Sequence, residues 1–316
     1  MKIMLFCEDR GIGYCGLACV VCSYENCNGC TEKIKNGDEC VIGRCAIEKG
    51  VDGCYACPDY PCDADMFKNK RIKAFNRYSQ EFGKNALIER LKTNSKNGIA
   101  YHKPNDTPGD YDIWETEEEI YQFLRYGRNN PYYKCPEFET EHFYIRQVRV
   151  QDACDLLECY SDLSSWVFYN NDFSKKIFAT QFPTADEIKA LINAWLDEYD
   201  GSVYVRFSII DKASCKVIGT IELCDKIGGD KTQAEVVRRG AALHIDLALD
   251  YETQRCISEI LSLADSNFYE IFGIKYLLSR AVPTATERIV ALKCAGFKSF
   301  PWEQEREHYY YNQMKP

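Results

Sequence analysis

The sequence lacks the long apolar runs that membrane proteins and secreted precursors carry. Its first apolar run covers residues 3–6 and is soon followed by Glu8 and Asp9, whereas a signal peptide holds roughly 7 to 15 apolar residues in a row. No segment approaches the roughly 18 apolar residues of a transmembrane helix. We therefore expect a cytoplasmic protein without a membrane partner, in which thiols stay reduced.

Positive charge and histidine are also scarce. The 39 Lys and Arg residues are outnumbered by 48 Asp and Glu residues, so the formal net charge is −9 at pH 7. A nucleic-acid-binding surface needs an excess of positive charge, and we therefore expect no nucleic-acid partner. Only four histidines occur in 316 residues, which leaves few side chains for acid–base catalysis near neutral pH.

Cysteine, by contrast, is abundant and concentrated. Ten of the 18 cysteines lie in one short segment: Cys15, Cys19, Cys22, Cys27, Cys30, Cys40, Cys45, Cys54, Cys57 and Cys62. Three pairs leave a two-residue gap, which places two sulfurs on one side of a tight turn at the spacing of one tetrahedral ion. Turn-forming residues and few large apolar side chains lie between them. Burial alone therefore cannot offset the chain entropy of this segment, and it needs staples.

Zinc is the staple that we predict, because ten thiolates suffice for about two four-coordinate ions. Disulfides are a second possibility, although a cytoplasmic location disfavours them. An iron–sulfur cluster is a third, since Cys15-x3-Cys19-x2-Cys22 matches the triplet of radical enzymes that use S-adenosylmethionine. The residues that follow do not continue as the strand–helix repeats of those enzymes. The spacing does not show which cysteines share an ion.

Residues 13–127 resemble a family of bacterial cysteine-rich domains without an assigned function. The likeness rests on Tyr-Cys-Gly-Leu-x-Cys-x-x-Cys at residues 14–22, on the Cys-Asn-Gly-Cys step at residues 27–30, and on Cys-x-x-Cys-x-x-x-Pro-Cys at residues 54–62. It implies a small metal-binding domain and brings no known reaction. We predict a cysteine-rich zinc-binding domain with a helical extension over residues 1–127, followed by a polar linker over residues 128–141 that holds two prolines. Within the extension, Gly83 should end one helix, and a capping box at Thr116-x-x-Glu119 should start another that ends at Gly127.

A second domain is predicted over residues 142–316, with the element order β-α-α-β-β-β-α-β-α-β-β. Asp152 is expected to cap the first helix of this domain, and capping boxes at Thr184-x-x-Glu187 and Thr284-x-x-Glu287 indicate two further helix starts. This order resembles that of the GNAT acyltransferases. Residues 217–221 look like their third strand, residues 243–249 with the following helix look like their coenzyme A motif, and residues 291–297 look like their closing helix and strand. The whole chain is thus expected to be α+β: a small metal-stapled domain followed by a mixed sheet flanked by helices.

The resemblance implies a coenzyme A site where the fourth and fifth strands of the family separate. The pantetheine arm would contact the backbone of the fourth strand, and the pyrophosphate would lie at the N-terminus of the next helix. The corresponding cofactor-binding residues are Leu247, Ala248, Leu249, Gln254, Arg255, Cys256 and Ile257. The glycines that the family places in this loop are missing: Arg255 and Ile257 stand there instead, so we expect side chains to crowd the phosphates. Arg255 could offset this by pairing with a phosphate.

Catalytic candidates are His244 and Asp246, which share one face of the fourth strand, and Glu222 on the third strand. In the family that this chain resembles, a carboxylate or histidine in this region removes a proton from the amine. A histidine satisfied within the core and a solvated glutamate are the structural alternatives. The asparagine and tyrosine that the family carries on its last helix correspond here to Ala285 and Leu292.

The sequence therefore predicts transfer of an acetyl group from acetyl-CoA to an amine, carried by a small molecule or a protein, while the zinc-binding domain positions the substrate or a partner. One alternative is a zinc-binding protein whose GNAT-like domain binds or senses a ligand without turnover. A weaker alternative is an iron–sulfur or radical enzyme that uses Cys15, Cys19 and Cys22.

Overall fold

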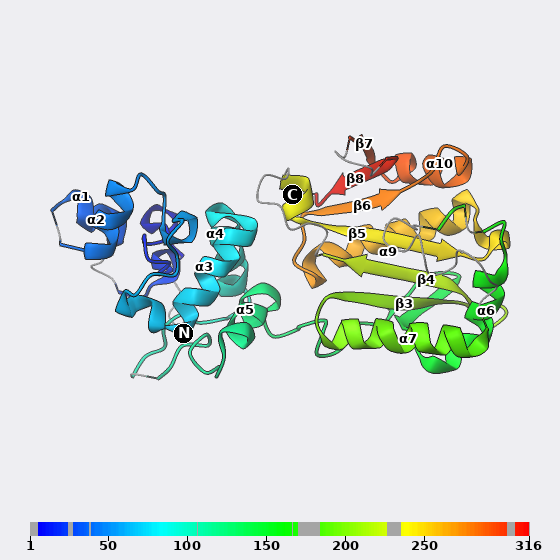
Figure 1. The fold of residues 1–316 in the computed structure, drawn as a ribbon, viewed down its shortest axis with the longest axis horizontal. Coiled ribbons are helices and arrows are strands. Elements are labelled where there is room, and N and C mark those ends of the chain that lie inside the picture. The colour runs from blue at the N-terminus through cyan, green and yellow to red at the C-terminus, as the bar shows by residue number, and fades with distance from the viewer. Residues whose placement is uncertain are drawn as a thin grey trace. The chain divides into compact units, whose positions relative to one another are not determined.

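The computed structural model describes residues 6–24, 28–37, 39–105, 107–165, 167–169, 184–225, 235–301 and 307–315. The chain divides into two compact units, residues 1–130 and 131–316 (Figure 1). No helix within the described ranges is long and apolar enough to cross a membrane.

The described part of the first unit consists of helices and turns. Its α-helices are α1 (Cys30–Lys35), α2 (Val41–Glu48), α3 (Lys70–Phe82), α4 (Lys84–Lys96) and α5 (Glu117–Tyr126), and its 3-10 turns are η1 (Glu8–Arg10), η2 (Cys19–Val21), η3 (Cys54–Ala56) and η4 (Asp65–Lys68). The predicted capping box of α5 is confirmed, because Thr116 and Glu119 each accept a hydrogen bond from the other's backbone amide. Gly83 ends α3 and Gly127 ends α5, as the sequence predicts.

The cysteine-rich segment has more apolar packing than its composition indicates. Ala18, Val20 and Val21 are buried in the same core as Phe75 of α3 and Leu124 of α5. The segment is therefore anchored at its start by a helical core. The turns around α2 and η3 contribute few side chains to that core. Burial therefore stabilises these turns little, and a further cross-link would have to hold them.

The second unit is built on one mixed sheet of eight strands. They are β1 (Phe138–Glu139), β2 (Phe143–Gln147), β3 (Tyr204–Asp211), β4 (Val217–Cys224), β5 (Gly240–Leu247), β6 (Tyr276–Arg280), β7 (Lys298–Phe300) and β8 (Tyr309–Gln313). The strand order is β1-β2-β3-β4-β5-β6-β8-β7, and only the β5–β6 pairing is parallel. The helices are α6 (Ala153–Ser161), α7 (Ala185–Asp200), α8 (Glu235–Arg238), α9 (Gln254–Ile271) and α10 (Thr286–Cys294), with 3-10 turns η5 (Val150–Asp152) and η6 (Leu249–Tyr251).

The predicted order of elements from β2 onward is confirmed, with α8 as an addition. Helices cover both faces of the sheet (Figure 1). Successive strand residues point to opposite faces: on β3, the Arg206 guanidinium lies 4.2 Å from the Trp195 ring of α7, while the neighbouring Phe207 stacks on Phe268 of α9. The face under α6 and α7 therefore differs from the face under α9: the charged side chain of Arg206 lies on the former, and the apolar ring of Phe207 lies on the latter.

The second unit begins earlier than the sequence predicts. Residues 131–141, assigned above to a linker, belong to it by their contacts. The Tyr132 ring lies 5.6 Å from that of Tyr199 and 6.3 Å from that of Phe272. β1 pairs with β2 through Phe138 and Ile145. The polar composition of this segment gave no sign that Tyr132 and Phe138 pack against aromatic rings of the second unit.

Two predicted helix starts are wrong in detail. Asp152 was expected to cap α6, but its carboxylate instead accepts hydrogen bonds from Arg146 at 2.7 Å and Ser208 at 2.7 Å. The capping box predicted at residues 284–287 does not form, because α10 starts after Ala285 and no side chain caps it. The box at residues 184–187, which starts α7, is confirmed.

Candidate functional site

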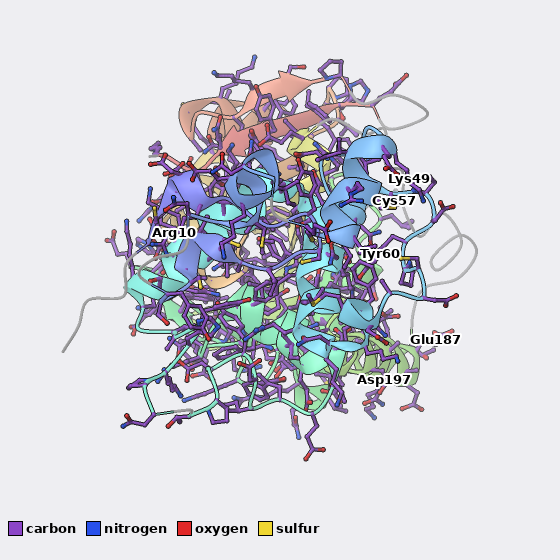
Figure 2. All side chains as sticks on the ribbon, turned by 90° about the vertical axis from the view of Figure 1, so that its left-hand side faces the viewer. Arg10, Lys49, Cys57, Tyr60, Glu187 and Asp197 are labelled. Carbon is purple, nitrogen blue, oxygen red and sulfur yellow. The ribbon has the colours of Figure 1, made fainter. Side chains whose placement is uncertain are left out.

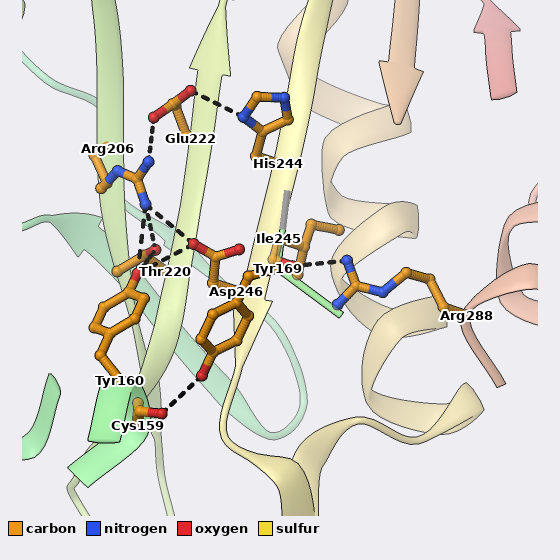
Figure 3. A network of polar contacts seen from close by, with 10 residues as sticks. All are labelled: Cys159, Tyr160, Tyr169, Arg206, Thr220, Glu222, His244, Ile245, Asp246 and Arg288. Carbon is orange, nitrogen blue, oxygen red and sulfur yellow. Dashed lines mark hydrogen bonds and ion pairs between the residues drawn. The ribbon is translucent and has the colours of Figure 1, made fainter. Parts of the chain in front are cut away.

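Three neighbouring strands bring the predicted catalytic residues together on the face under α6 and α7. The register places Arg206 of β3, Glu222 of β4 and His244 of β5 in one cross-strand row. Thr220 and Asp246 lie opposite each other in the next row on the same face. Every second residue of a strand lies on the same face, and directly opposed side chains are neighbours in an antiparallel sheet. These five side chains therefore form one polar cluster (Figure 3).

The cluster is joined by ion pairs and hydrogen bonds. Glu222 Oε1 lies 3.0 Å from His244 Nδ1, and the other oxygen of Glu222 accepts from the Arg206 guanidinium. Arg206 also reaches Asp246 Oδ2 at 3.3 Å. Each of these side chains is at most 12% exposed. Arg206 was missed by sequence analysis, although its position opposite Glu222 follows once the register of β3 on β4 is known.

The electrostatics of the cluster favour a charged Glu222 and Arg206. Burial opposes ionisation of Glu222, but the charge of Arg206 and the hydrogen bond from His244 outweigh it and hold the pKa of Glu222 well below its usual range. Burial likewise opposes the charge on Arg206, and its carboxylate neighbours nevertheless raise the pKa of Arg206 above its usual value. Since an ionised carboxylate can only accept, His244 Nδ1 donates to Glu222.

Side chains from α6 and α7 form the cover of the cluster. The hydroxyl of Tyr160 donates to Asp246 Oδ2 at 3.2 Å and lies 3.0 Å from Thr220 Oγ1. Trp195 packs over the Arg206 guanidinium. Burial raises the pKa of the Tyr160 hydroxyl well above its ordinary value, so this group remains protonated and acts as a donor.

The two central strands separate where the GNAT resemblance implies. β5 and β6 pair only from Gly240 to Ala242, opposite residues 276–278. The following residues of β5, 243–247, pair with β4 and form no register pair with β6 along the described strands. Gly219 of β4 allows the close approach on the other side, since a Cβ there would lie 2.1 Å from the carbonyl oxygen of Asp246. Within the sheet, the far end of β5 therefore pairs with β4 and not with β6.

The backbone amides of the predicted cofactor loop are already engaged. The amide of Ala248 donates to the carbonyl of Ile218 at 2.8 Å. The amide of Gln254 donates to the Glu287 carboxylate at 2.9 Å, and that of Cys256 to Thr253 Oγ1 at 3.3 Å. A phosphate that accepts from the amide of Gln254 or Cys256 would have to replace the partner that the amide has now.

The side chains of the loop lie differently from the prediction. Ile257 is fully buried in the core and does not crowd the helix start. Arg255 is exposed, and its guanidinium lies 2.6 Å from His142 Nε2, whose Nδ1 lies 2.9 Å from Glu259. Leu247 is buried and Leu249 is 43% exposed. The expectation that Ile257 blocks the phosphates is therefore wrong, because its place on the helix points it inward.

The residues predicted to hold metal form pairs in the described part of the chain. Cys19 Sγ lies 4.0 Å from Cys30 Sγ, and Cys22 Sγ lies 3.9 Å from Nδ1 of His102, a residue that the sequence analysis did not single out. Cys27 lies outside the described residues. None of the described cysteines forms a disulfide. Two thiolates bound to one tetrahedral zinc would be about 3.8 Å apart, so the Cys19–Cys30 pair fits one edge of such a site.

Four further cysteines line a single cavity of the first unit: Cys45, Cys54, Cys57 and Cys62. Lys49 Nζ lies 3.9 Å from Cys57 Sγ at its edge (Figure 2). Burial, and then the nearby thiols, raise the pKa of Cys54 to about 12. Across the described residues, no group of three or more His, Cys, Asp or Glu side chains is close enough to hold a metal ion. Cys15 and Cys40 lie in neither set, and Cys40 Sγ accepts from the Gly43 amide at the start of α2.

Comparisons with known proteins match the two units separately. Residues 23–66 match a family model described as a protein of unknown function (DUF3795). No curated protein matches the chain. Among solved structures, the C-terminal part of the chain is similar to a ribosomal-protein-serine acetyltransferase, titled as putative, from Vibrio cholerae, with 12% identity, 57% of this chain and 98% of that chain covered, and a TM-score of 0.43.

Two other solved structures give similar values. A GNAT-family acetyltransferase from Bacillus anthracis has 13% identity and a TM-score of 0.42, covering 57% of this chain and 99% of that chain. Spermidine N-acetyltransferase from Vibrio cholerae, solved with CoA and spermine, has 14% identity and a TM-score of 0.41, covering 55% of this chain and 96% of that chain.

Proposed function

We propose that the second unit transfers an acyl group, with acetyl-CoA as donor, to a primary amine. The observation that carries this proposal is the separation of β5 from β6 beside a buried Glu222–His244 pair. The part of β5 that has no register pair with β6 is where an extended acyl carrier would bind, and the adjacent pair would supply a base. The element order, which is the one implied by the GNAT resemblance, supports the same reading.

The direction of the hydrogen bond between Glu222 and His244 determines which ring nitrogen can act as the base. Glu222 fixes the imidazole by accepting from His244 Nδ1, so Nε2 is the nitrogen that takes a proton from the ammonium form of the acceptor. The neutral amine then attacks the thioester carbonyl, the attacking nitrogen gives up its second proton to water as the amide bond forms, and the carbon–sulfur bond breaks. The departing thiolate takes a proton from water or from the protonated base. Arg206 keeps Glu222 ionised throughout and acts as a positioning residue.

The test is release of coenzyme A thiol from acetyl-CoA in the presence of a panel of amines, including polyamines and lysine peptides. We expect His244→Ala to lower the rate by about 100-fold or more, the usual contribution of a positioned base. His308→Asn is the matched control, because His308 is exposed and asparagine tolerates its φ of 66°. Equal rates for wild type and His244→Ala would exclude His244 as the base.

For the first unit, we infer that the ten cysteines hold about two zinc ions, with His102 as an additional candidate ligand beside Cys22. The Cys19–Cys30 distance and the shared cavity of Cys45, Cys54, Cys57 and Cys62 support two separate groups. Binding would draw each group closer together. Elemental analysis of the purified protein should find zinc, and a brown protein with bound iron would instead favour a cluster.

A second function for the GNAT-like unit is ligand binding without turnover. The observation that favours it is the engagement of the cofactor loop by the chain's own groups, in particular the Gln254 amide by Glu287. The thiol-release assay separates the two functions, because a unit that binds acetyl-CoA but releases no thiol with any amine binds the ligand without turnover.

A further inference from the structure

We propose that the first turn of α10 closes the coenzyme A cleft from within: Glu287 occupies the phosphate position at the start of α9, and Arg288 fills the gap between β5 and β6. This inference rests on the proposed function, because it assumes that the cleft serves an acyl-CoA. It adds a regulatory step, since the donor can enter only when this turn moves.

Glu287 stands where an anion would bind. Its carboxylate accepts the amide of Gln254 at 2.9 Å, and this amide belongs to the first residue of an 18-residue helix. Helix starts attract negative charge because their amides lack helical partners. A carboxylate here satisfies one of those amides and repels a pyrophosphate by its charge.

Arg288 stands where the pantetheine arm would run. Its guanidinium donates to the carbonyl of Ile245 at 2.8 Å, within the part of β5 that has no register pair with β6 (Figure 3). Two further hydrogen bonds, both at 2.7 Å, bind it side by side to the carboxylate of Glu252. The side chains of Arg288 and Glu252 are 2% and 5% exposed. A buried, bidentate pair therefore seals this gap.

The two contacts belong to adjacent residues of one helix, so a single movement releases both. Opening must break the two hydrogen bonds between Arg288 and Glu252 and the one to the Ile245 carbonyl, and these contacts favour the closed form. The apparent affinity for the donor is then lowered by the fraction of molecules that are open. A variant that weakens the closed form should bind acetyl-CoA more tightly. A site that has only lost the family's phosphate-binding residues would gain no affinity from the same variant.

The experiment is calorimetric titration of the full chain with acetyl-CoA. Glu287→Gln removes the competing charge at an exposed position and should lower Kd by about ten-fold. Glu270→Gln, which makes the same charge change near the other end of α9, should leave Kd unchanged. The double variant Arg288→Ala with Glu252→Gln opens the gap without leaving a buried charge and should also bind more tightly than wild type.

Hydrogen exchange provides the second readout. Acetyl-CoA should accelerate exchange of the amides at residues 286–290 in the wild type, because α10 must release its first turn. Equal Kd values for wild type and Glu287→Gln, with unchanged exchange in α10, would overturn closure and leave the proposed function intact. Absence of binding by wild type and by all variants would overturn the proposed function, and closure with it.

Discussion

The two proposed ligand sites differ in whether groups of the chain itself already occupy them. In the cysteine-rich segment the thiols stand in pairs, such as Cys19 and Cys30, that no third described ligand completes. In the predicted coenzyme A cleft the chain supplies its own partners, with Glu287 on an amide and Arg288 in the strand gap. Under the two proposals, the first site would gain order when zinc binds, whereas the second would have to give up contacts before acetyl-CoA could enter.

This difference teaches how each unit should respond to its ligand. If the zinc proposal is right, a segment held by few apolar side chains depends on metal for its stability. If the closure proposal is right, the second unit needs no ligand to fold, and its affinity for the ligand is reduced by the cost of opening. The predictions that follow test this contrast, beginning with the largest effect.

Metal removal should unfold the cysteine-rich segment and leave the second unit folded. Zinc sites in small domains contribute on the order of 10 kcal/mol to folding, far more than this segment's apolar packing. Calorimetric scans with and without a strong chelator should show loss of the first unit's transition only, and added zinc should restore it. An unchanged scan in a protein shown to be free of metal would remove the contrast between the units.

Loss of one partner of the Arg288–Glu252 pair should destabilise the second unit strongly. Arg288→Ala leaves Glu252 as an unpaired buried charge, and such changes cost about 3 to 5 kcal/mol. Adding Glu252→Gln should recover most of the loss. Urea denaturation of the second unit measures both variants, and a loss below about 1 kcal/mol for Arg288→Ala would show that the gap is wet and unsealed.

Acid should weaken the second unit through Glu222. Its pKa in the folded protein lies below the ordinary value of 4.5, so its ionised form contributes stability above about pH 4.5. That contribution is lost as the pH falls through the lower folded pKa. Each unit of pKa difference corresponds to about 1.4 kcal/mol. Glu222→Gln should therefore flatten the acid limb of the stability curve, whereas the exposed control Glu270→Gln should leave its slope as in wild type.

The smallest expected effects are those of matching helix caps in the two units. Thr116→Ala removes the cap of α5 and Thr184→Ala that of α7, and each should cost about 1 kcal/mol. Each variant should shift only the unfolding transition of its own unit. If either one shifts both transitions equally, the units unfold together and cannot be compared as separate bodies.

Local signals in the sequence were enough to predict much of the fold. Thr116 and Thr184 start helices, and Gly83 and Gly127 end them, because capping depends on residues within one turn. Alternation along β5 placed His244 and Asp246 on one face. These predictions needed no knowledge of distant partners.

What sequence reasoning missed depends on distant partners. Arg206 joins the cluster only through the register of β3 on β4, and Glu287 meets Gln254 across 33 positions of the chain. The three-residue spacing of Thr284 and Glu287 resembled a capping box, but the longer-range contact prevailed. Tyr132 lies in a polar segment, and its packing on Tyr199 has no local signature.

The most direct test of the central claim is the thermal unfolding of the second unit at increasing concentrations of acetyl-CoA. A ligand that binds only the folded state adds about 2.7 kcal/mol at 100 times its Kd. For a Kd on the order of tens of micromolar, the value expected of a cleft that must open, millimolar acetyl-CoA should visibly raise the Tm of the second unit and leave that of the first unchanged. No shift at millimolar acetyl-CoA would contradict acyl transfer and favour ligand binding without turnover.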